Sequence, residues 1–256
     1  MQYRLCLVFP ICMILSLRPL IGVAQGKTAR IAGGTFSPLY QAGAKTSVVR
    51  IRAFRIDSFP VSVANFRKFL LSSPQWRPEN ISPLFAEPGY LNRLARIPES
   101  NEEHRPVTNV SWFAANAYCR QLNGYLPSVN QWEYVAAADE VRKDASRDPV
   151  FVQRLLAWYG APESNTQEIG KSPPNVWGVS DLHGVVWEWV NDFNSIFVAG
   201  DNRRDGDDLK NLFCASGAVS ASDRANYAAF MRYALRSSLK GNFTLNNLGF
   251  RCAYDN

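Results

Sequence analysis

A short aromatic segment of the chain carries a carboxylate that could act in proton transfer. Glu188 lies between the indoles of Trp187 and Trp189, in a segment that begins with a glycine and two valines. Apolar surroundings disfavour the ionised form, so the indoles would raise the pKa of Glu188 towards the range of a general base. The alternative is a structural cluster whose carboxylate is satisfied by backbone donors, because most aromatic side chains in such motifs belong to the core.

A second segment near the C-terminus, residues 247–252, reads Asn-Leu-Gly-Phe-Arg-Cys and predicts a tethered terminal strand. Cys6 and Cys12 fall in an expected leader, which leaves Cys119, Cys214 and Cys252. In an oxidising compartment two of these would pair. We expect Cys119 and Cys252 to do so, closing a loop of more than a hundred residues that stabilises the fold by about 4–5 kcal/mol in the chain-entropy model. Cys214 is then an unpaired thiol, interpreted as a small buried hydrophobe, with redox use as the alternative.

The first 24 residues are typical of a secretory signal peptide. Arg4 precedes an uncharged, mostly apolar stretch over residues 5–17, and small residues lead up to Gln25. The stretch is too short to span a membrane comfortably. We therefore expect cleavage, a mature single domain over residues 25–256 in the periplasm or outside the cell, and no membrane span after cleavage.

Charge and histidine content exclude several classes of function. The formal net charge of +6 falls to about +4 once Arg4 and Arg18 leave with the leader. No run of Lys and Arg exceeds two residues, so a nucleic-acid partner is not expected. His104 and His183 are the two histidines of the chain, so a three-histidine metal centre is impossible, and we expect no metal site.

Local patterns predict the elements that would position these groups. Alternating apolar residues predict strands over residues 30–36 and 48–59, and a helical face predicts a helix over residues 61–71. Ser111 can cap a helix over residues 112–122, and the spacing of Ser128 and Gln131 is that of a capping box at the start of another helix. A further helix is expected over residues 148–156. Residues 72–105 are predicted to form a long surface excursion, and residues after 160 irregular loops with short strands. The fold class is therefore α+β with a high loop content.

Several motifs together resemble those of the formylglycine-generating enzyme family, also called sulfatase-modifying factors. The resemblance runs over residues 31–254 and is carried by Gly33-Gly34-Thr35-Phe36, Pro106-Val107, Val110-Ser111-Trp112, Leu126-Pro127-Ser128, Trp132-Glu133, Gly178 with Asp181, Trp187-Glu188-Trp189, Arg236-Ser237 and Asn247 to Cys252. It implies a loop-rich variant of the C-type lectin fold. The disulfide of that family also falls on Cys119 and Cys252.

The chain departs from this family at the positions that make its members catalysts. Aligned on Leu235-Arg236-Ser237, the active-site cysteine pair is replaced by Ala228 and Tyr233. Copper(I) held by a thiolate pair is therefore not expected, because that ion requires soft sulfur ligands. Val185 stands where the family has asparagine in a calcium-binding stretch, which puts the calcium site in doubt. The iron-dependent sulfoxide-synthase branch requires three histidines. No motif in the sequence indicates another cofactor.

The chain resembles cysteine-free exported members of the family, namely the pyoverdine-maturation type and the accessory protein of copper nitrite reductase. This resemblance implies oxidative tailoring or maturation of a periplasmic small molecule or peptide. Three residues would be catalytic: Glu188, Tyr233 and Arg236. Four would bind substrate: Trp187, Tyr227, Arg232 and Asn247. An arginine would hold an anionic or planar substrate by bidentate contact. The alternative is a non-catalytic, lectin-like accessory module that assists assembly of a periplasmic partner enzyme, for example a copper enzyme. Residues 72–105 would then be its docking surface.

Overall fold

The computed structural model describes residues 26–38, 48–96, 103–160, 167–194 and 224–256. Its elements in chain order are β1 (Thr28–Ile31), β2 (Gly34–Phe36), β3 (Val49–Ile51), β4 (Phe54–Asp57), α1 (Val63–Ser72), the 3-10 helix η1 (Pro74–Trp76), α2 (Asn92–Arg96), α3 (Trp112–Gln121), α4 (Val129–Ala136), α5 (Pro149–Tyr159), β5 (Trp187–Glu188), α8 (Arg224–Ser238), β6 (Leu248–Gly249) and β7 (Ala253–Tyr254). The predicted signal peptide and Cys214 lie outside the described residues. The prediction of a loop-rich α+β fold is confirmed.

Three small sheets organise the described residues. β4 lies between β1 and β7 in an antiparallel sheet, β2 pairs with β3 antiparallel, and β5 pairs with β6 in parallel. Each of the two predicted N-terminal strands is divided in two. A Cβ atom on Gly33 would lie 2.8 Å from the carbonyl oxygen of Ile51, so the close approach that divides β1 from β2 requires glycine.

The helix starts follow the capping residues that the sequence predicts. The hydroxyl of Ser111 accepts a hydrogen bond from the backbone N–H of Ala114 at the start of α3. At α4 the capping box is complete, because Ser128 accepts from the N–H of Gln131 and the Gln131 side chain accepts from the N–H of Ser128. Asp148 caps α5, which continues to Tyr159, beyond the predicted end. These helices were predictable because their start signals are local.

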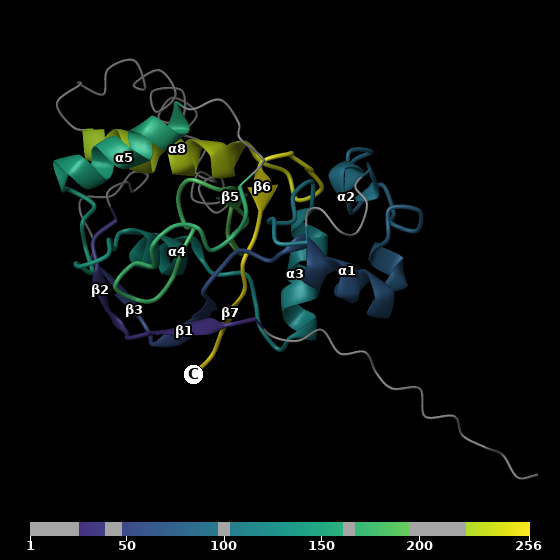
Figure 1. The fold of residues 1–256 in the computed structure, drawn as a ribbon, viewed down its shortest axis with the longest axis horizontal. Helices are drawn as coiled ribbons and strands as arrows, with labels where there is room; N and C mark the ends of the chain where they lie inside the picture. Colours follow the sequence, from purple (N-terminus) through teal and green to yellow (C-terminus); the bar gives the residue numbers. More distant parts are fainter. Residues whose placement is uncertain (1–25, 39–47, 97–102, 161–166, 195–223) are drawn as a thin grey trace, which may run out of the picture.

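Helix α8 was not predicted, and the expectation of irregular structure after residue 160 was wrong at this place. The stripe that α8 turns inward contains Ala228, Arg232 and Arg236, spaced four residues apart and all buried. Apolar periodicity fails to reveal such a helix because two of its buried positions are charged. In Figure 1, α8 lies beside α5 on one side of the molecule, while α1, α2 and α3 lie on the other.

The core joins the C-terminal segment to the N-terminal helices. Phe66 and Phe69 of α1 pack with each other and with Tyr118 of α3, and Phe250 packs with Phe66 and Tyr118, at ring-centroid distances of 5.2 to 6.0 Å. The predicted disulfide is confirmed: Cys119 on α3 is bonded to Cys252, 133 residues later, with 5.4 Å between the Cα atoms. Together these contacts fix the segment that carries Arg251.

The predicted surface excursion is anchored to the fold by aromatic residues. Tyr90 is buried and its hydroxyl donates to the carbonyl oxygen of Trp76 at 2.9 Å. Phe85 is half exposed and packs against Phe113 of α3 with 5.2 Å between ring centroids. None of the helices among the described residues is long and apolar enough to cross a membrane.

Candidate functional site

Glu188 forms a buried ion pair with Arg251. The parallel pairing of β5 with β6 sets Glu188 opposite Gly249, so that Arg251 follows two residues later. Nε and Nη2 of Arg251 donate to both carboxylate oxygens at 2.8 to 3.0 Å, and neither side chain is exposed to solvent. The remaining donors of Arg251 reach the carbonyl oxygens of Asp57 and Ser180 at 3.1 and 3.0 Å. The charges of the pair balance within the interior.

Two further groups complete this arrangement, which we call the Glu188 cluster (Asp57, Trp132, Glu188 and Arg251). The indole N–H of Trp132 donates to Oε2 of Glu188 at 2.7 Å. Asp57 accepts from the backbone N–H of Cys252 and from the hydroxyl of Tyr254. Burial raises the pKa of Asp57 to about 6, although these donors and Arg251 oppose the rise. Every member is satisfied, so the geometry gives Glu188 a structural role; its role as a general base stays a prediction.

Two arginines of α8 share a second buried carboxylate, Glu133 of α4. Nε and Nη2 of Arg232 donate to Glu133 at 2.6 to 3.0 Å, and Nη1 of Arg236 donates to it at 2.6 Å. Burial alone would raise the pKa of Glu133, but the two guanidinium charges together lower it to about 2. Nη1 of Arg232 also donates to the hydroxyl of Tyr159 and to the carbonyl oxygen of Ala228. This triad therefore holds one more positive than negative charge.

Trp132 connects the two buried charge groups. Its N–H binds Glu188, and the guanidinium carbons of Arg236 and Arg232 lie 4.6 and 6.0 Å from the centre of its ring. An indole between a carboxylate and two guanidinium groups interacts favourably with both, through its N–H at the edge and its π face. The predicted catalytic residues Glu188 and Arg236 thus approach the same indole.

The predicted substrate-binding residues are only partly brought together. The ring of Trp187 stacks on Tyr159, with 5.1 Å between centroids, and Tyr159 in turn binds Arg232. The backbone N–H of Trp187 donates to the carbonyl oxygen of Asn247 at 2.8 Å. Tyr227 lies near the start of α8 with 40% of its surface exposed. No described contact joins Tyr227 to the other predicted residues.

The positions that match the cysteine pair of the family face a filled interior. Ala228 and Tyr233 are both buried on α8 and line a void of about 20 Å³ against α5. A void of that size holds about one water molecule. No substrate could enter there without movement of Phe151, Leu155 or Arg232, which line the same void.

A larger pocket of about 210 Å³ also lies against α5 and shares Phe151 and Leu155 with the small void. We call it the Asp181 pocket. Its lining comprises carboxylates, one arginine, one histidine and an apolar wall: Ala138, Asp139, Glu140, Phe151, Arg154, Leu155, Trp158, Ser172, Pro173, Asn175, Val179, Asp181, Leu182, His183 and Gly184. Its volume is many times the ~15 Å³ that a single water requires. Among the described residues, no three His, Cys, Asp or Glu side chains come together as a metal site.

Two side chains of this pocket carry acceptor atoms without a partner. Asp181 is 3% exposed; its Oδ2 accepts from the N–H of Gly170, but its Oδ1 is buried and unpaired. Nε2 of His183 lies 3.0 Å from the carbonyl oxygen of Ala136, so this nitrogen carries the proton and Nδ1 is an acceptor. Nδ1 is buried and also unpaired. Burial, assisted by the charge of Arg232, lowers the pKa of His183 to about 3, so the ring is neutral.

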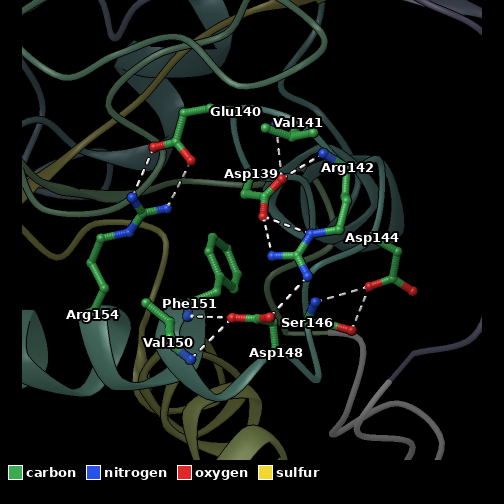
Figure 2. A network of polar contacts seen from close by, with 10 residues as sticks. All are labelled: Asp139, Glu140, Val141, Arg142, Asp144, Ser146, Asp148, Val150, Phe151 and Arg154. Carbon is green, nitrogen blue, oxygen red and sulfur yellow. Dashed lines mark hydrogen bonds and ion pairs between the residues drawn. The ribbon is translucent and has the colours of Figure 1, made fainter.

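The rim of the pocket is held by a polar network on the turn between α4 and α5 (Figure 2). Arg142 binds Asp139 and also Asp148, the residue that caps α5. Glu140 and Arg154 form an ion pair of 2.8 Å across the rim. Asp139, Asp148 and Glu140 thus each have a cationic partner, in contrast to Asp181.

The sequence did not single out the pocket residues as functional. Asp181 was noted only as part of a family motif, and His183 only as one of two histidines. The available sequence signal was the spacing of Gly178, Asp181 and Gly184, residue types that tolerate a left-handed backbone. In the structure these residues have φ of 80°, 60° and 96°, so residues 178–184 form a sharply turned loop. The spacing of glycines and aspartate indicates that loop, but not that an acceptor is left unpaired.

Comparisons with known proteins identify the family of the chain and relatives that share its fold. The family model described as "Sulfatase-modifying factor enzyme 1-like domain" matches residues 22–256. The formylglycine-generating enzyme of Mus musculus is 27% identical over 259 residues, covering 81% of this chain and 67% of that protein. The inactive C-alpha-formylglycine-generating enzyme 2 of Mus musculus is 29% identical over 246 residues, covering 80% and 76%. The structure of PvdO from Pseudomonas aeruginosa has a TM-score of 0.52 at 17% identity and covers 92% of this chain and 97% of its own, which shows a shared fold. The chain belongs to the formylglycine-generating enzyme, or sulfatase-modifying factor, family.

Proposed function

We propose that this chain is an exported family member that binds a substrate or partner during its maturation, and that it does not generate formylglycine. The observation that carries the proposal is the pair Ala228 and Tyr233 on α8. Neither side chain offers a thiolate, and both face a void with room for one water. Cys119 and Cys252 are consumed in the disulfide, so Cys214 alone remains in the expected mature chain and cannot form a thiolate pair.

The state of the other candidate groups supports binding rather than thiolate chemistry. Glu188 is engaged on both oxygens by Arg251 and Trp132, and Glu133 by Arg232 and Arg236. Groups that are fully paired stabilise the fold and are not available to a substrate. The Asp181 pocket, with its unpaired acceptors and apolar wall, is the arrangement suited to a ligand.

Deletion of the gene in its source organism tests the proposal. Exported metabolites and proteins are compared by mass spectrometry between the wild type, the deletion strain and the strain complemented with the chain. We expect a precursor or an immature partner to accumulate in the deletion strain and to co-purify unchanged with the tagged chain. N-terminal sequencing of the purified chain should begin near Gln25 if it is exported. A deletion strain with unaltered products would contradict the proposal.

Oxidative tailoring by the chain itself is a second candidate. It is favoured by Asp181, whose unpaired Oδ1 is an acceptor in a residue lining the pocket. The two electrons and two protons removed from the substrate would pass to dissolved dioxygen, which is reduced to hydrogen peroxide. The same comparison separates the two functions. Conversion of the accumulated precursor by the purified chain, with loss of the mass of the removed hydrogens, establishes catalysis. Binding of the precursor without a change of mass establishes the accessory role.

A further inference from the structure

The positive charge of the chain is concentrated in its first strands. Residues 25–56 contain six Lys and Arg and no Asp or Glu, whereas residues 57–256 contain 20 Lys and Arg against 22 Asp and Glu, a formal net charge of −2. The described basic residues of the first group are Lys27, Arg30, Arg50, Arg52 and Arg55, all exposed except the half-buried Arg55. In Figure 1 the strands that carry them lie together along the lower edge of the view. Such a separation of charge indicates an anionic ligand or partner at these strands.

Two of these arginines lie directly opposite each other on neighbouring strands. The register of β1 and β4 pairs Arg30 with Arg55, so both side chains lie on the same face of the sheet. Like charges in such a cross-strand pair destabilise a sheet. Within the described part of the chain, no ion pair involves either arginine. The repulsion between the two guanidinium groups is therefore not compensated by those residues.

Arg30 and Arg55 both line an open hollow of about 670 Å³. This volume lies within the ~300–1,000 Å³ of small-molecule sites. Arg55 is held from one side, because its Nε donates to the carbonyl oxygen of Asp255 at 3.2 Å and its guanidinium carbon lies 5.4 Å from the centre of the Tyr254 ring. Its two terminal amino groups make no hydrogen bond to the described residues, so they are available to a ligand.

The lining of the hollow contains two cations and no acidic side chain: Arg30, Ile31, Ala32, Ala53, Arg55 and Asn256. Asp255 lies beside Arg55, but its carboxylate is engaged by another group. Burial raises the pKa of the Tyr125 hydroxyl, and a hydrogen bond to the carboxylate of Asp255 raises it further, although a hydrogen bond from Gln131 opposes the rise. Only the carbonyl oxygen of Asp255 is bonded to Arg55. The hollow is therefore suited to an anion brought by a ligand.

We infer that Arg30 and Arg55 form a binding site for a phosphate group, free or as a monoester, on the outer face of the β1-β4-β7 sheet. A guanidinium presents parallel N–H donors that match two oxygens of a phosphate. A phosphate monoester carries a charge of about −1.5 to −2 at pH 7, which balances two guanidinium groups, whereas a carboxylate balances one. Bound phosphate replaces the repulsion between the arginines with two attractions. The site lies on other residues than the Asp181 pocket, so the inference does not rest on the proposed function.

Calorimetry on the purified chain tests the inference with inorganic phosphate and with acetate at equal, low ionic strength, because salt screens exposed charges. We expect phosphate to bind at least about tenfold more tightly than acetate, since two charge-assisted contacts replace one. Equal affinities, or no binding of phosphate, would overturn the inference. The comparison uses the unaltered protein, so it does not depend on how any variant folds.

A pair of variants assigns the binding to the hollow. Arg30→Gln should weaken phosphate binding at least about fivefold, because one of the two guanidinium groups is lost. Without phosphate, the same variant should be at least as stable as the wild type in thermal unfolding, because a like-charge pair is removed. Arg147→Gln removes an exposed arginine on the turn before α5 that does not line the hollow, and it should leave the affinity unchanged. Equal losses in the two variants would show that phosphate responds only to the overall charge, which would overturn the inference.

Vesicles that contain phosphatidic acid distinguish the two sources of a phosphate group. Sedimentation of the chain with these vesicles, lost in Arg30→Gln, would support the site and identify a lipid headgroup as its ligand. Binding of free phosphate without sedimentation would support the site and identify a soluble phosphate ester.

Discussion

The Glu188 cluster and the Asp181 pocket contain similar side chains but differ in how completely their hydrogen bonds are satisfied. In the cluster a carboxylate, a guanidinium and an indole satisfy one another completely, with neither Glu188 nor Arg251 exposed. In the pocket a buried carboxylate and an imidazole each keep one acceptor unpaired. The difference teaches that a carboxylate beside aromatic rings is not by itself a site. A better indication of a site is a buried hydrogen-bond acceptor that no donor of the fold reaches.

The largest effect should come from breaking the cluster. Glu188→Gln leaves the buried charge of Arg251 without a counter-charge, which should lower the free energy of unfolding by about 3–5 kcal/mol in urea titrations. Glu140→Gln is the matched control, since its partner Arg154 is more than half exposed, and it should cost less than about 1 kcal/mol. A Glu188→Gln protein as stable as the wild type would return Glu188 to the candidates for catalysis.

The triad around Glu133 should show its pairing as acid sensitivity. The pKa of Glu133 is lowered in the fold to about 2, so its contribution is complete above 4.5 and is lost as the pH falls towards 2. Glu133→Gln should therefore cost on the order of 3–4 kcal/mol at neutral pH, and the difference from the wild type should shrink as the solution is acidified. Urea titrations of both proteins between pH 7 and pH 3 measure this. A difference that does not change with pH would mean that the two arginines do not stabilise the ionised form of Glu133.

Asp57 should give the opposite pH dependence within the Glu188 cluster. Its pKa is raised from 3.8 to about 6 in the fold, so the folded state holds the proton more tightly than the unfolded chain. Its contribution is complete below 3.8 and is lost as the pH rises through 6. Relative to the wild type, Asp57→Asn should therefore gain on the order of 3 kcal/mol between pH 4 and pH 7. Equal stability differences at both pH values would contradict the raised pKa.

Local signals in the sequence sufficed for part of this arrangement. The caps at Ser111 and Ser128 and the strand alternation each depend on a few neighbouring residues, and all were predictable. Helix α8 was not, since its buried stripe includes Arg232 and Arg236, whose place inside the fold depends on Glu133 about a hundred residues earlier.

The same limit applies to the candidate site. Glu188 was singled out as a carboxylate between indoles, but its partner Arg251 lies 63 residues later, and no spacing rule joins the two. The unpaired acceptors of Asp181 and His183 are defined by the absence of a neighbour in space. A sequence pattern describes which residues are present and cannot show which contacts are missing.

The smallest effect on stability should come from a substitution in the Asp181 pocket, which contrasts directly with Glu188→Gln in the Glu188 cluster. Asp181→Asn removes an uncompensated charge, and asparagine tolerates the left-handed backbone that Asp181 adopts. Its side-chain oxygen can still accept from the N–H of Gly170. We therefore expect the free energy of unfolding at pH 7 to change by less than about 1 kcal/mol, or to rise, because residues kept for binding are often not optimal for stability. A loss as large as that of Glu188→Gln would show that Asp181 stabilises the fold as Glu188 does. Unchanged stability in Asp181→Asn, beside a large loss in Glu188→Gln, would show that Glu188 stabilises the fold and Asp181 does not.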